Sequence, residues 1–215
     1  MPILSRWRRY CHAVRGSTAA ELVAAPRPKQ LATSIHGVVL FELAPLHDER
    51  GSLTELCRFE WMAPIELPQW NLVKSEAGVL RGMHWHNHHH DLISPAEGTL
   101  LVGLSDLRRG SPTEGAAELL ELDAQRPAAA LVPPGVAHGL YSRERTVTLY
   151  AVSRYWDADD ELGVVFDDPD LGVPWPVSRV DVVLSERDAA LPRLALAGRV
   201  PDWAPEPPRA AEPAS

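Results

Sequence analysis

The sequence has few cysteines, no long apolar run and comparatively little positive charge. Two cysteines in 215 residues are too few for a disulfide framework, and their spacing matches no zinc motif. No run approaches the roughly 18 apolar residues of a membrane helix, and no apolar segment with a small-residue cleavage site follows the N-terminal arginines. We therefore expect a cytoplasmic protein that does not associate with membranes.

Acidic side chains outnumber basic ones, and the two signs are unevenly distributed. Residues 1–35 carry six basic side chains and one acidic one, whereas the rest of the chain carries 15 basic and 28 acidic ones. This balance argues against nucleic acid as the main partner. An anionic ligand would have to be bound by a few well-placed arginines.

The chain has the length of one ordinary domain, and its 45% hydrophobic content is enough for a substantial core. Residues 1–35 show no sustained hydrophobic periodicity apart from a possible short helix near 17–24, which predicts an N-terminal extension or arm over residues 1–35. The main domain is expected over 36–199, followed by a tail rich in proline and alanine over 200–215.

Short apolar runs separated by Gly, Pro, Asp and Ser predict an all-β barrel or sandwich. One late segment, residues 185–191, predicts instead a short helix with Ser185 as its N-cap. The strands are expected over residues 36–43, 53–59, 69–74, 79–86, 99–105, 119–123, 129–132, 147–153 and 163–166.

Five of the nine histidines lie between His84 and His90. Because side chains alternate along a strand, His84 and His86 should face one side and Trp85 the other, so that two imidazoles share one cavity. The three histidines 88–90 follow Asn87 at a strand end, and we expect them to form a solvated turn.

The spacing of His84, His86, Asp91 and Gly98 resembles the first cupin motif, and the segment PPGVAH (133–138) resembles the second. This resemblance implies a cupin barrel, the double-stranded β-helix or jelly roll, with short flanking helices. It also implies that His84, His86, Asp91 and His138 come together, and such nitrogen and oxygen donors suit Fe, Mn, Ni or Zn.

The chain further resembles the dTDP-4-dehydrorhamnose 3,5-epimerases, cupin enzymes of nucleotide-sugar biosynthesis. The resemblance covers roughly residues 36–192 and depends on several motifs in the family's order. These are DERGSLTE (48–55), QWN (69–71), GVLRGMH (78–84), DLRRGSPT (106–113), PGVAHG (134–139), LY (149–150), DDP (167–169), WP (175–176) and LSERDAA (184–190).

The resemblance implies catalytic roles for three residues. His84 matches the catalytic base, Asp188 matches the carboxylate that orients it, and Tyr150 matches the acid on the opposite face of the sugar. An imidazole is a competent base at neutral pH, a carboxylate stabilises its protonated form, and inversion needs a second group that can return a proton.

The same resemblance implies a substrate-binding set and an assembly. Arg50 and Arg81 match diphosphate-binding arginines, and Glu55, Gln69, Asn71 and His138 match residues that contact the nucleotide or sugar. The family needs no cofactor and is typically a homodimer in which an N-terminal strand crosses to the partner, so Arg50 could serve the neighbouring subunit's site.

The sequence departs from the family at the position of its keto-oxygen-binding lysine. Asp91 stands in that region, His86 replaces a usual glutamine, and Ser94 replaces a frequent arginine. A carboxylate would repel the negative charge that develops on the ketone oxygen. Protonated His86 or His138, or a metal ion at His86, Asp91 and His138, could take over this role.

Three hypotheses follow from these observations. The first is a cofactor-independent epimerase of a nucleotide-linked 4-keto-6-deoxyhexose that inverts C3, C5 or both. The second is a metal-dependent cupin, an oxygenase or isomerase of a non-sugar metabolite, with a divalent metal at His84, His86, Asp91 and His138. The third is a non-catalytic, ligand-binding cupin. The first two compete for His84, because a ring nitrogen that binds metal cannot also abstract a proton.

Overall fold

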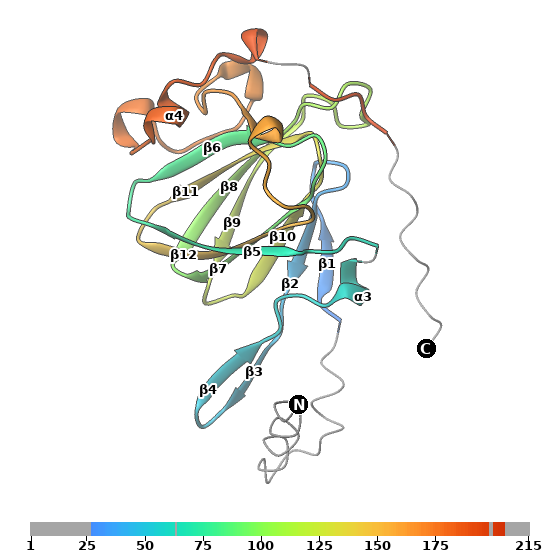
Figure 1. Ribbon diagram of the computed structural model, residues 1–215. Coiled ribbons are helices and arrows are strands. Elements are labelled where there is room, and N and C mark those ends of the chain that lie inside the picture. Colours follow the sequence, from blue (N-terminus) through green and yellow to red (C-terminus); the bar gives the residue numbers. More distant parts are fainter. Residues whose placement is uncertain (1–26, 63, 198–199, 205–215) are drawn as a thin grey trace, which may run out of the picture.

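The computed structural model describes residues 27–62, 64–197 and 200–204 and shows an all-β jelly roll. Two antiparallel sheets face each other, and the short helices of the C-terminal part of the chain gather at one end of the barrel (Figure 1). The expected cupin barrel with short flanking helices is confirmed. None of the helices in the described ranges is long and apolar enough to cross a membrane.

The larger sheet has six strands in the order β1-β2-β10-β7-β12-β5. Tyr150 lies on β12 of this sheet, and Asp91 begins β7, the neighbouring strand. The bounds are β1 (Lys29–Ala32), β2 (Val39–Glu42), β10 (Ala128–Val132), β7 (Asp91–Glu97), β12 (Thr146–Val152) and β5 (Gln69–Ser75).

The smaller sheet has five strands in the order β13-β6-β11-β8-β9. His84 on β6 is the register partner of His138 on β11. The bounds are β13 (Leu162–Gly163), β6 (Leu80–Trp85), β11 (Val136–Ser142), β8 (Thr99–Asp106) and β9 (Ala117–Asp123).

Apolar side chains form three clusters, one between the sheets and one on the outer face of each. The central cluster includes Ile93 from one sheet and Val102 from the other, with Tyr150 packed against it. Trp85 and Met83 belong to the cluster outside the smaller sheet, where the chain after β13 covers them. His84 therefore faces the barrel interior from the strand that sends Trp85 outward.

The helices are single turns. Helix α3 (Phe59–Met62) covers the outer face of the larger sheet, and α4 (Glu186–Ala189) contacts β6. Ser185 caps α4 as predicted, since its hydroxyl accepts a hydrogen bond from the Asp188 N–H. The 3-10 helices are η2 (Ala158–Asp160), η3 (Pro169–Leu171), η4 (Arg179–Asp181) and η5 (Leu194–Leu196).

The expected strand over 53–59 is wrong, because β4 ends at Thr54 and α3 begins at Phe59. Strands β1, β3, β7 and β11 were not expected. β7 contains Pro95, and β11 contains His138 and Gly139, so neither resembles a typical apolar run. The helix expected near residues 17–24 lies outside the described residues.

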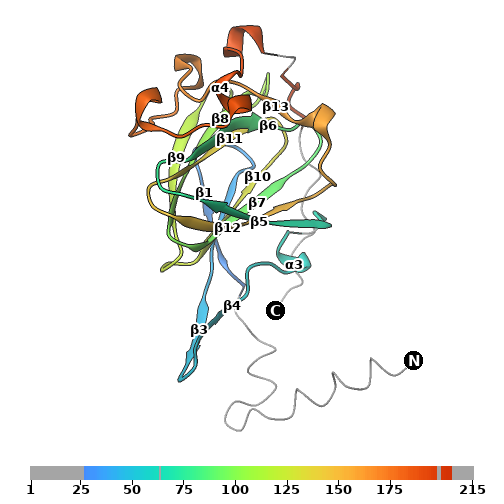
Figure 2. The same ribbon diagram turned by 60° about the vertical axis from the view of Figure 1, so that its left-hand side comes forward.

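A two-stranded hairpin, β3 (Pro45–Asp48) and β4 (Gly51–Thr54), projects away from the barrel, as Figures 1 and 2 both show.

Strand β1 lies at the edge of the six-stranded sheet, and Ile35 is buried in the central cluster. Both precede residue 36. The division into an arm, a domain and a tail stays a prediction.

Candidate active site

A cavity of about 310 Å³ opens between the two sheets. His84 and His86 line it from the smaller sheet and Tyr150 lines it from the larger one, together with His138 and Asp188. The expectation that the two imidazoles share one cavity is confirmed.

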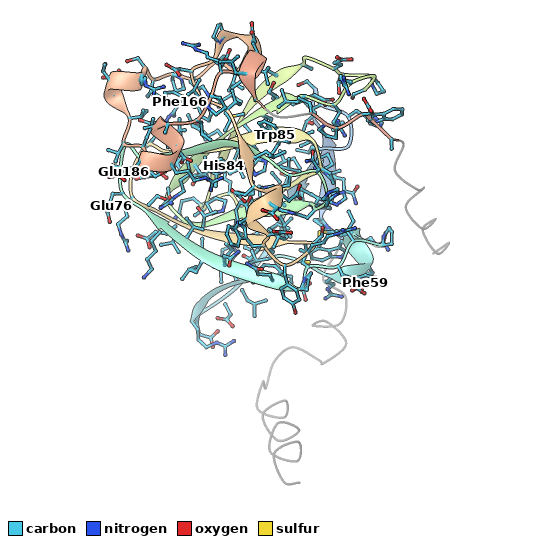
Figure 3. The ribbon with its side chains drawn as sticks, turned by 45° about the horizontal axis from the view of Figure 1, so that its top comes forward. Phe59, Glu76, His84, Trp85, Phe166 and Glu186 are labelled. Carbon is cyan, nitrogen blue, oxygen red and sulfur yellow. The ribbon has the colours of Figure 1, made fainter. Side chains whose placement is uncertain are left out.

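His84 is held by a carboxylate from the C-terminal segment. Its Nε2 lies 2.7 Å from Asp188 Oδ1, and Figure 3 shows the labelled His84 beside the segment that carries Glu186. Its Nδ1 lies 3.5 Å from Glu161 Oε1. With Nε2 engaged by Asp188, Nδ1 is the ring nitrogen left to act in the cavity.

Asp188 is buried and fully engaged. Burial alone would raise the pKa of Asp188, but its bond to His84, the charge of that imidazole and the Gly82 N–H bring this pKa below its usual value. The Gly82 N–H donates to Asp188 Oδ2 at 3.3 Å. Asp188 is therefore ionised at neutral pH and can stabilise a protonated His84.

Gly82 permits this arrangement because β6 and β11 approach each other closely there. A Cβ at this position would lie 2.7 Å from Gly139 Cα and 2.8 Å from the His138 carbonyl oxygen, and the backbone has a φ of +119°. Only glycine adopts this conformation without strain.

Tyr150 lines the cavity and belongs to a buried chain of hydrogen-bonded side chains. Its hydroxyl donates to Asp91 Oδ1 at 2.8 Å and lies 3.0 Å from His138 Nε2. His138 Nδ1 in turn lies 3.2 Å from the Val136 carbonyl oxygen. Asp91, which occupies the region of the family's lysine, thus bonds the proposed acid directly.

Burial sets the protonation states in this chain. It raises the pKa of Tyr150 well above its ordinary value, and the charge and hydrogen bond of Asp91 act in the same direction. Burial also lowers the pKa of His138 to about 4 despite the opposing charge of Asp91. At neutral pH Tyr150 is therefore a phenol and His138 a neutral imidazole.

The prediction that residues 88–90 form a solvated turn is wrong for His89, which is 3% exposed, and correct for His88, which is exposed. The Asp160 carboxylate accepts hydrogen bonds from the N–H groups of Asn87 and His88 at 2.8 and 3.2 Å. These bonds fold the loop back, so that the His89 ring stacks on His86 at a centroid distance of 3.9 Å.

The predicted binding residues divide into two groups. Gln69, Asn71 and Arg81 line the cavity, and the Arg81 guanidinium donates to Ser75 and to the Lys74 carbonyl. His138 lines it as well.

Arg50 and Glu55 are not among the residues that line this cavity. Arg50 lies on the projecting hairpin, where it pairs with Asp48, and Glu55 pairs with Arg58.

The cavity residues that the sequence did not predict include Trp156, Glu161 and Arg187. Glu161 accepts a hydrogen bond from Trp156 Nε1 at 2.9 Å, and Arg187 donates to its carbonyl oxygen at 3.1 Å. Glu161 ends the acidic run 157–161, which looks like solvated surface. Glu161 is brought to the cavity because the next residues, Leu162–Gly163, pair with β6 beside His84, which is a tertiary contact that no local signal in the sequence indicates.

Two buried groups have donors suited to a metal ion. One consists of His86, Asp91 and His138, and the other of His86, His89 and Asp160; within each group the candidate donor atoms lie within 4.8 Å of one another. His84 belongs to neither group. The four-residue metal set expected from the cupin motifs is therefore not gathered in one group, because His84 Nε2 lies against Asp188.

Comparison with known proteins identifies relatives over most of the chain. Residues 32–195 match the family model of dTDP-4-dehydrorhamnose 3,5-epimerase. Curated epimerases of that name from Sinorhizobium fredii and Pseudomonas aeruginosa are each 33% identical, over 75% and 72% of this chain and 87% and 90% of their own lengths.

Solved structures give the same result. A dTDP-6-deoxy-D-glucose-3,5-epimerase from Legionella pneumophila, in complex with dTDP-4-keto-L-rhamnose, has a TM-score of 0.77 and 28% identity over 82% of this chain and 99% of its own. A 3'-monoepimerase from Streptomyces bikiniensis, in complex with dTDP-quinovose, has a TM-score of 0.70 and 30% identity over 76% of this chain and 86% of its own.

The epimerase relatives belong to the isomerases of deoxysugar biosynthesis, as the sequence motifs predicted. The chain belongs to the dTDP-4-dehydrorhamnose 3,5-epimerase family.

Proposed function

We propose that the protein epimerises a nucleotide-linked 4-keto-6-deoxyhexose, inverting C3, C5 or both. One observation carries the proposal: an imidazole backed by a buried carboxylate and a buried phenol line the same cavity from opposite sheets. Inversion needs a base and an acid on the two faces of one carbon, and His84 and Tyr150 are arranged to supply them.

In this mechanism His84 Nδ1 removes the hydrogen next to the ketone. Asp188 fixes the ring through Nε2 and stabilises the positive charge that His84 gains. The carbon then receives a proton from Tyr150 on its other face. Before the next turnover His84 releases its proton to solvent, and Tyr150 regains one from solvent. Asp188 acts here as the orienting carboxylate and Tyr150 as the acid.

The remaining predicted residues would bind the substrate. Gln69, Asn71, His138 and Arg81 line the cavity, where Arg81 supplies positive charge for a diphosphate. The relatives bound to dTDP sugars support a dTDP-linked substrate. One of these relatives is named a 3,5-epimerase and the other a 3'-monoepimerase. The number of carbons that this protein inverts is therefore a property to be measured.

We propose a cytoplasmic homodimer that needs no cofactor, with a divalent metal ion as the alternative, and with the projecting hairpin reaching the partner's site. This assembly would bring Arg50, and with it Glu55, to the partner's cavity. The apolar pair Leu46 and Leu53, 39% and 57% exposed, supports burial of the hairpin against a second copy.

The alternative enzyme, a metal-dependent cupin that acts as an oxygenase or isomerase on a non-sugar metabolite, has no support among these relatives. The non-catalytic alternative predicts nucleotide binding without isotope exchange. The experiment below therefore separates it from an epimerase.

The protein is incubated with dTDP-4-keto-6-deoxyglucose in D2O, and deuterium at C3 and C5 is measured by mass spectrometry and NMR. We expect deuterium at one or both carbons, and His84→Asn should lower its incorporation by about 100-fold or more. Tyr150→Phe should keep part of the exchange but lose the inverted product. Folded protein that incorporates no deuterium would refute the proposal.

A further inference from the structure

The structure separates two sites that the sequence analysis placed in competition. His84 Nε2 lies 2.7 Å from Asp188, and His84 belongs to neither group of candidate metal ligands. His86, Asp91 and His138 converge without it, and they are 4%, 1% and 3% exposed. A cation at these three residues would leave His84 free to act as a base.

The distances in this group fit a shared ion better than direct hydrogen bonds. His86 Nε2 and His138 Nε2 lie 3.8 and 3.7 Å from Asp91 Oδ2. Hydrogen bonds between nitrogen and oxygen are about 2.7–3.2 Å long. Two ligands that are each about 2.1 Å from one tetrahedral ion lie about 3.4 Å apart, so each nitrogen is within a few tenths of an ångström of that distance from the carboxylate oxygen.

The far side of each imidazole is arranged as in metal-binding histidines. His86 Nδ1 lies 3.1 Å from the Asp160 carbonyl oxygen, and His138 Nδ1 lies 3.2 Å from that of Val136. A carbonyl can only accept, so each Nδ1 carries the proton and each Nε2 presents a lone pair. That of His86 lies 3.8 Å from Asp91 Oδ2, and that of His138 lies 3.0 Å from the Tyr150 hydroxyl and 3.7 Å from Asp91 Oδ2. Because the Tyr150 hydroxyl donates its proton to Asp91, neither Nε2 lone pair receives a proton from these contacts, and a cation between them and the carboxylate would provide a partner.

We propose that His86, Asp91 and His138 bind one divalent transition-metal ion. Two imidazoles and one carboxylate suit Zn, Mn, Fe(II) or Ni, and three protein ligands leave a coordination position open. His86 and His138 also line the cavity, so that position is accessible from the substrate side. The relatives reported above are not named as metal proteins, and the inference rests on the residues of this chain.

The role of the ion, unlike its binding, rests on the proposed function. Asp91 stands where the resemblance expects a lysine beside the keto oxygen, and alone it would repel negative charge there. A divalent ion at Asp91 reverses the sign of the local charge. The cation would then take the role of the family's lysine. It would stabilise the negative charge that develops on the keto oxygen when His84 removes the hydrogen.

Binding is tested on the full chain after chelator treatment, by separate titration with Zn²⁺ and Co²⁺. We expect one equivalent per chain, with a visible Co²⁺ spectrum typical of nitrogen and oxygen ligands. His86→Ala and Asp91→Asn should each weaken binding by at least about 10-fold. His88→Ala is the matched control, because His88 is exposed in the same histidine run, and it should leave the affinity within about twofold.

Thermal unfolding without metal establishes that each variant folds, and His138→Gln provides a third ligand substitution of similar size. Absence of stoichiometric binding by wild type would overturn the site. Equal affinity in wild type and His86→Ala, or loss of binding in His88→Ala alone, would also overturn it, because the metal would then be held by surface histidines.

Deuterium exchange by stripped and loaded protein separates the site from its role. Exchange at least about 10-fold faster with metal supports the role, whereas equal rates overturn the role and leave the binding site standing. A protein that binds metal at these ligands and exchanges no deuterium in either form would contradict the proposed function instead.

Discussion

At the scale of single residues, the bond between His84 and Asp188 decides which ring nitrogen is available. Asp188 engages Nε2 at 2.7 Å, and the Gly82 N–H and the Ser185 hydroxyl hold Asp188 in turn. The Gly82 N–H donates to the carboxylate, and the Ser185 hydroxyl accepts from the Asp188 backbone N–H at 3.0 Å, so both the side chain and the backbone of Asp188 are fixed. The pair therefore acts as one preorganised unit.

Replacing Asp188 with Asn should lower the rate of deuterium exchange by about 100-fold or more, with a smaller change in KM, because the amide no longer stabilises a positive His84. Kinetic assays of exchange measure this directly. Glu186→Gln, an exposed change on the same helix turn, is the control and should keep wild-type rates. An Asp188→Asn variant as fast as wild type would contradict the role given to this carboxylate.

The same carboxylate should make stability depend on acid pH. The pKa of Asp188 is lower in the folded protein than in the unfolded chain, where an aspartate has a pKa of about 3.9. The contribution of Asp188 to the free energy of unfolding is therefore complete only above about pH 4. It is lost as the pH falls through the folded value. Urea unfolding from pH 6 to pH 3 should thus show a steeper loss of stability for wild type than for Asp188→Asn; identical slopes would contradict this.

At the scale of secondary-structure elements, the closeness of β6 and β11 positions the site. The register pairs His84 with His138, and the two strands touch at Gly82 and Gly139. The alternation along β6 could be predicted from the sequence, and it correctly placed Trp85 opposite His84. The partner strand could not, because β11 is interrupted by histidine and glycine.

Gly82→Ala should cost about 3 kcal/mol or more of unfolding free energy, since the new Cβ would meet backbone atoms at 2.7 and 2.8 Å. Gly110→Ala is a matched control: Gly110 also has a positive φ, but an added Cβ would have no neighbour within 4 Å. It should lose about 1–2 kcal/mol from backbone strain alone. Denaturant unfolding compares the two, and equal losses would show that contact at Gly82 is unimportant.

The loop of residues 87–90 shows where local patterns fail. A run of histidines after a strand predicts solvent exposure, yet Asp160, more than 70 residues away in sequence, caps the loop and turns His89 inward. The burial of His89 therefore depends on the path of the chain before β13, which no local pattern encodes.

At the scale of the whole molecule, the projecting hairpin is the feature that a single chain does not explain. Residues 45–54 leave the barrel and expose an apolar cross-strand pair together with Arg50 (Figure 2). Arg50, expected to bind diphosphate, is separated from the chain's own cavity lining. A second copy would account for both observations.

Light scattering coupled to size exclusion should give about twice the 23.7 kDa mass of one chain. Leu53→Asp should shift the protein towards monomer, because it places a charge in the proposed interface. Arg50→Ala should stay dimeric but bind the nucleotide sugar about 10-fold more weakly. A fully active monomeric wild type would contradict this assembly.

The sequence by itself determined the all-β class, the alternation that turns two imidazoles inward, the N-cap of α4 and the ordered motifs of the epimerase family. These depend on short-range periodicity and on residue types at fixed spacing. The resemblance to the family also implied the pairing of Asp188 with His84, which residue spacing alone could not give. Only the tertiary structure decided that Asp91 bonds Tyr150 beside His138, and only it brought Glu161 into the cavity. Asp188 lies 104 residues from His84 in sequence, and such contacts follow from sheet register and chain path, which residue spacing does not specify.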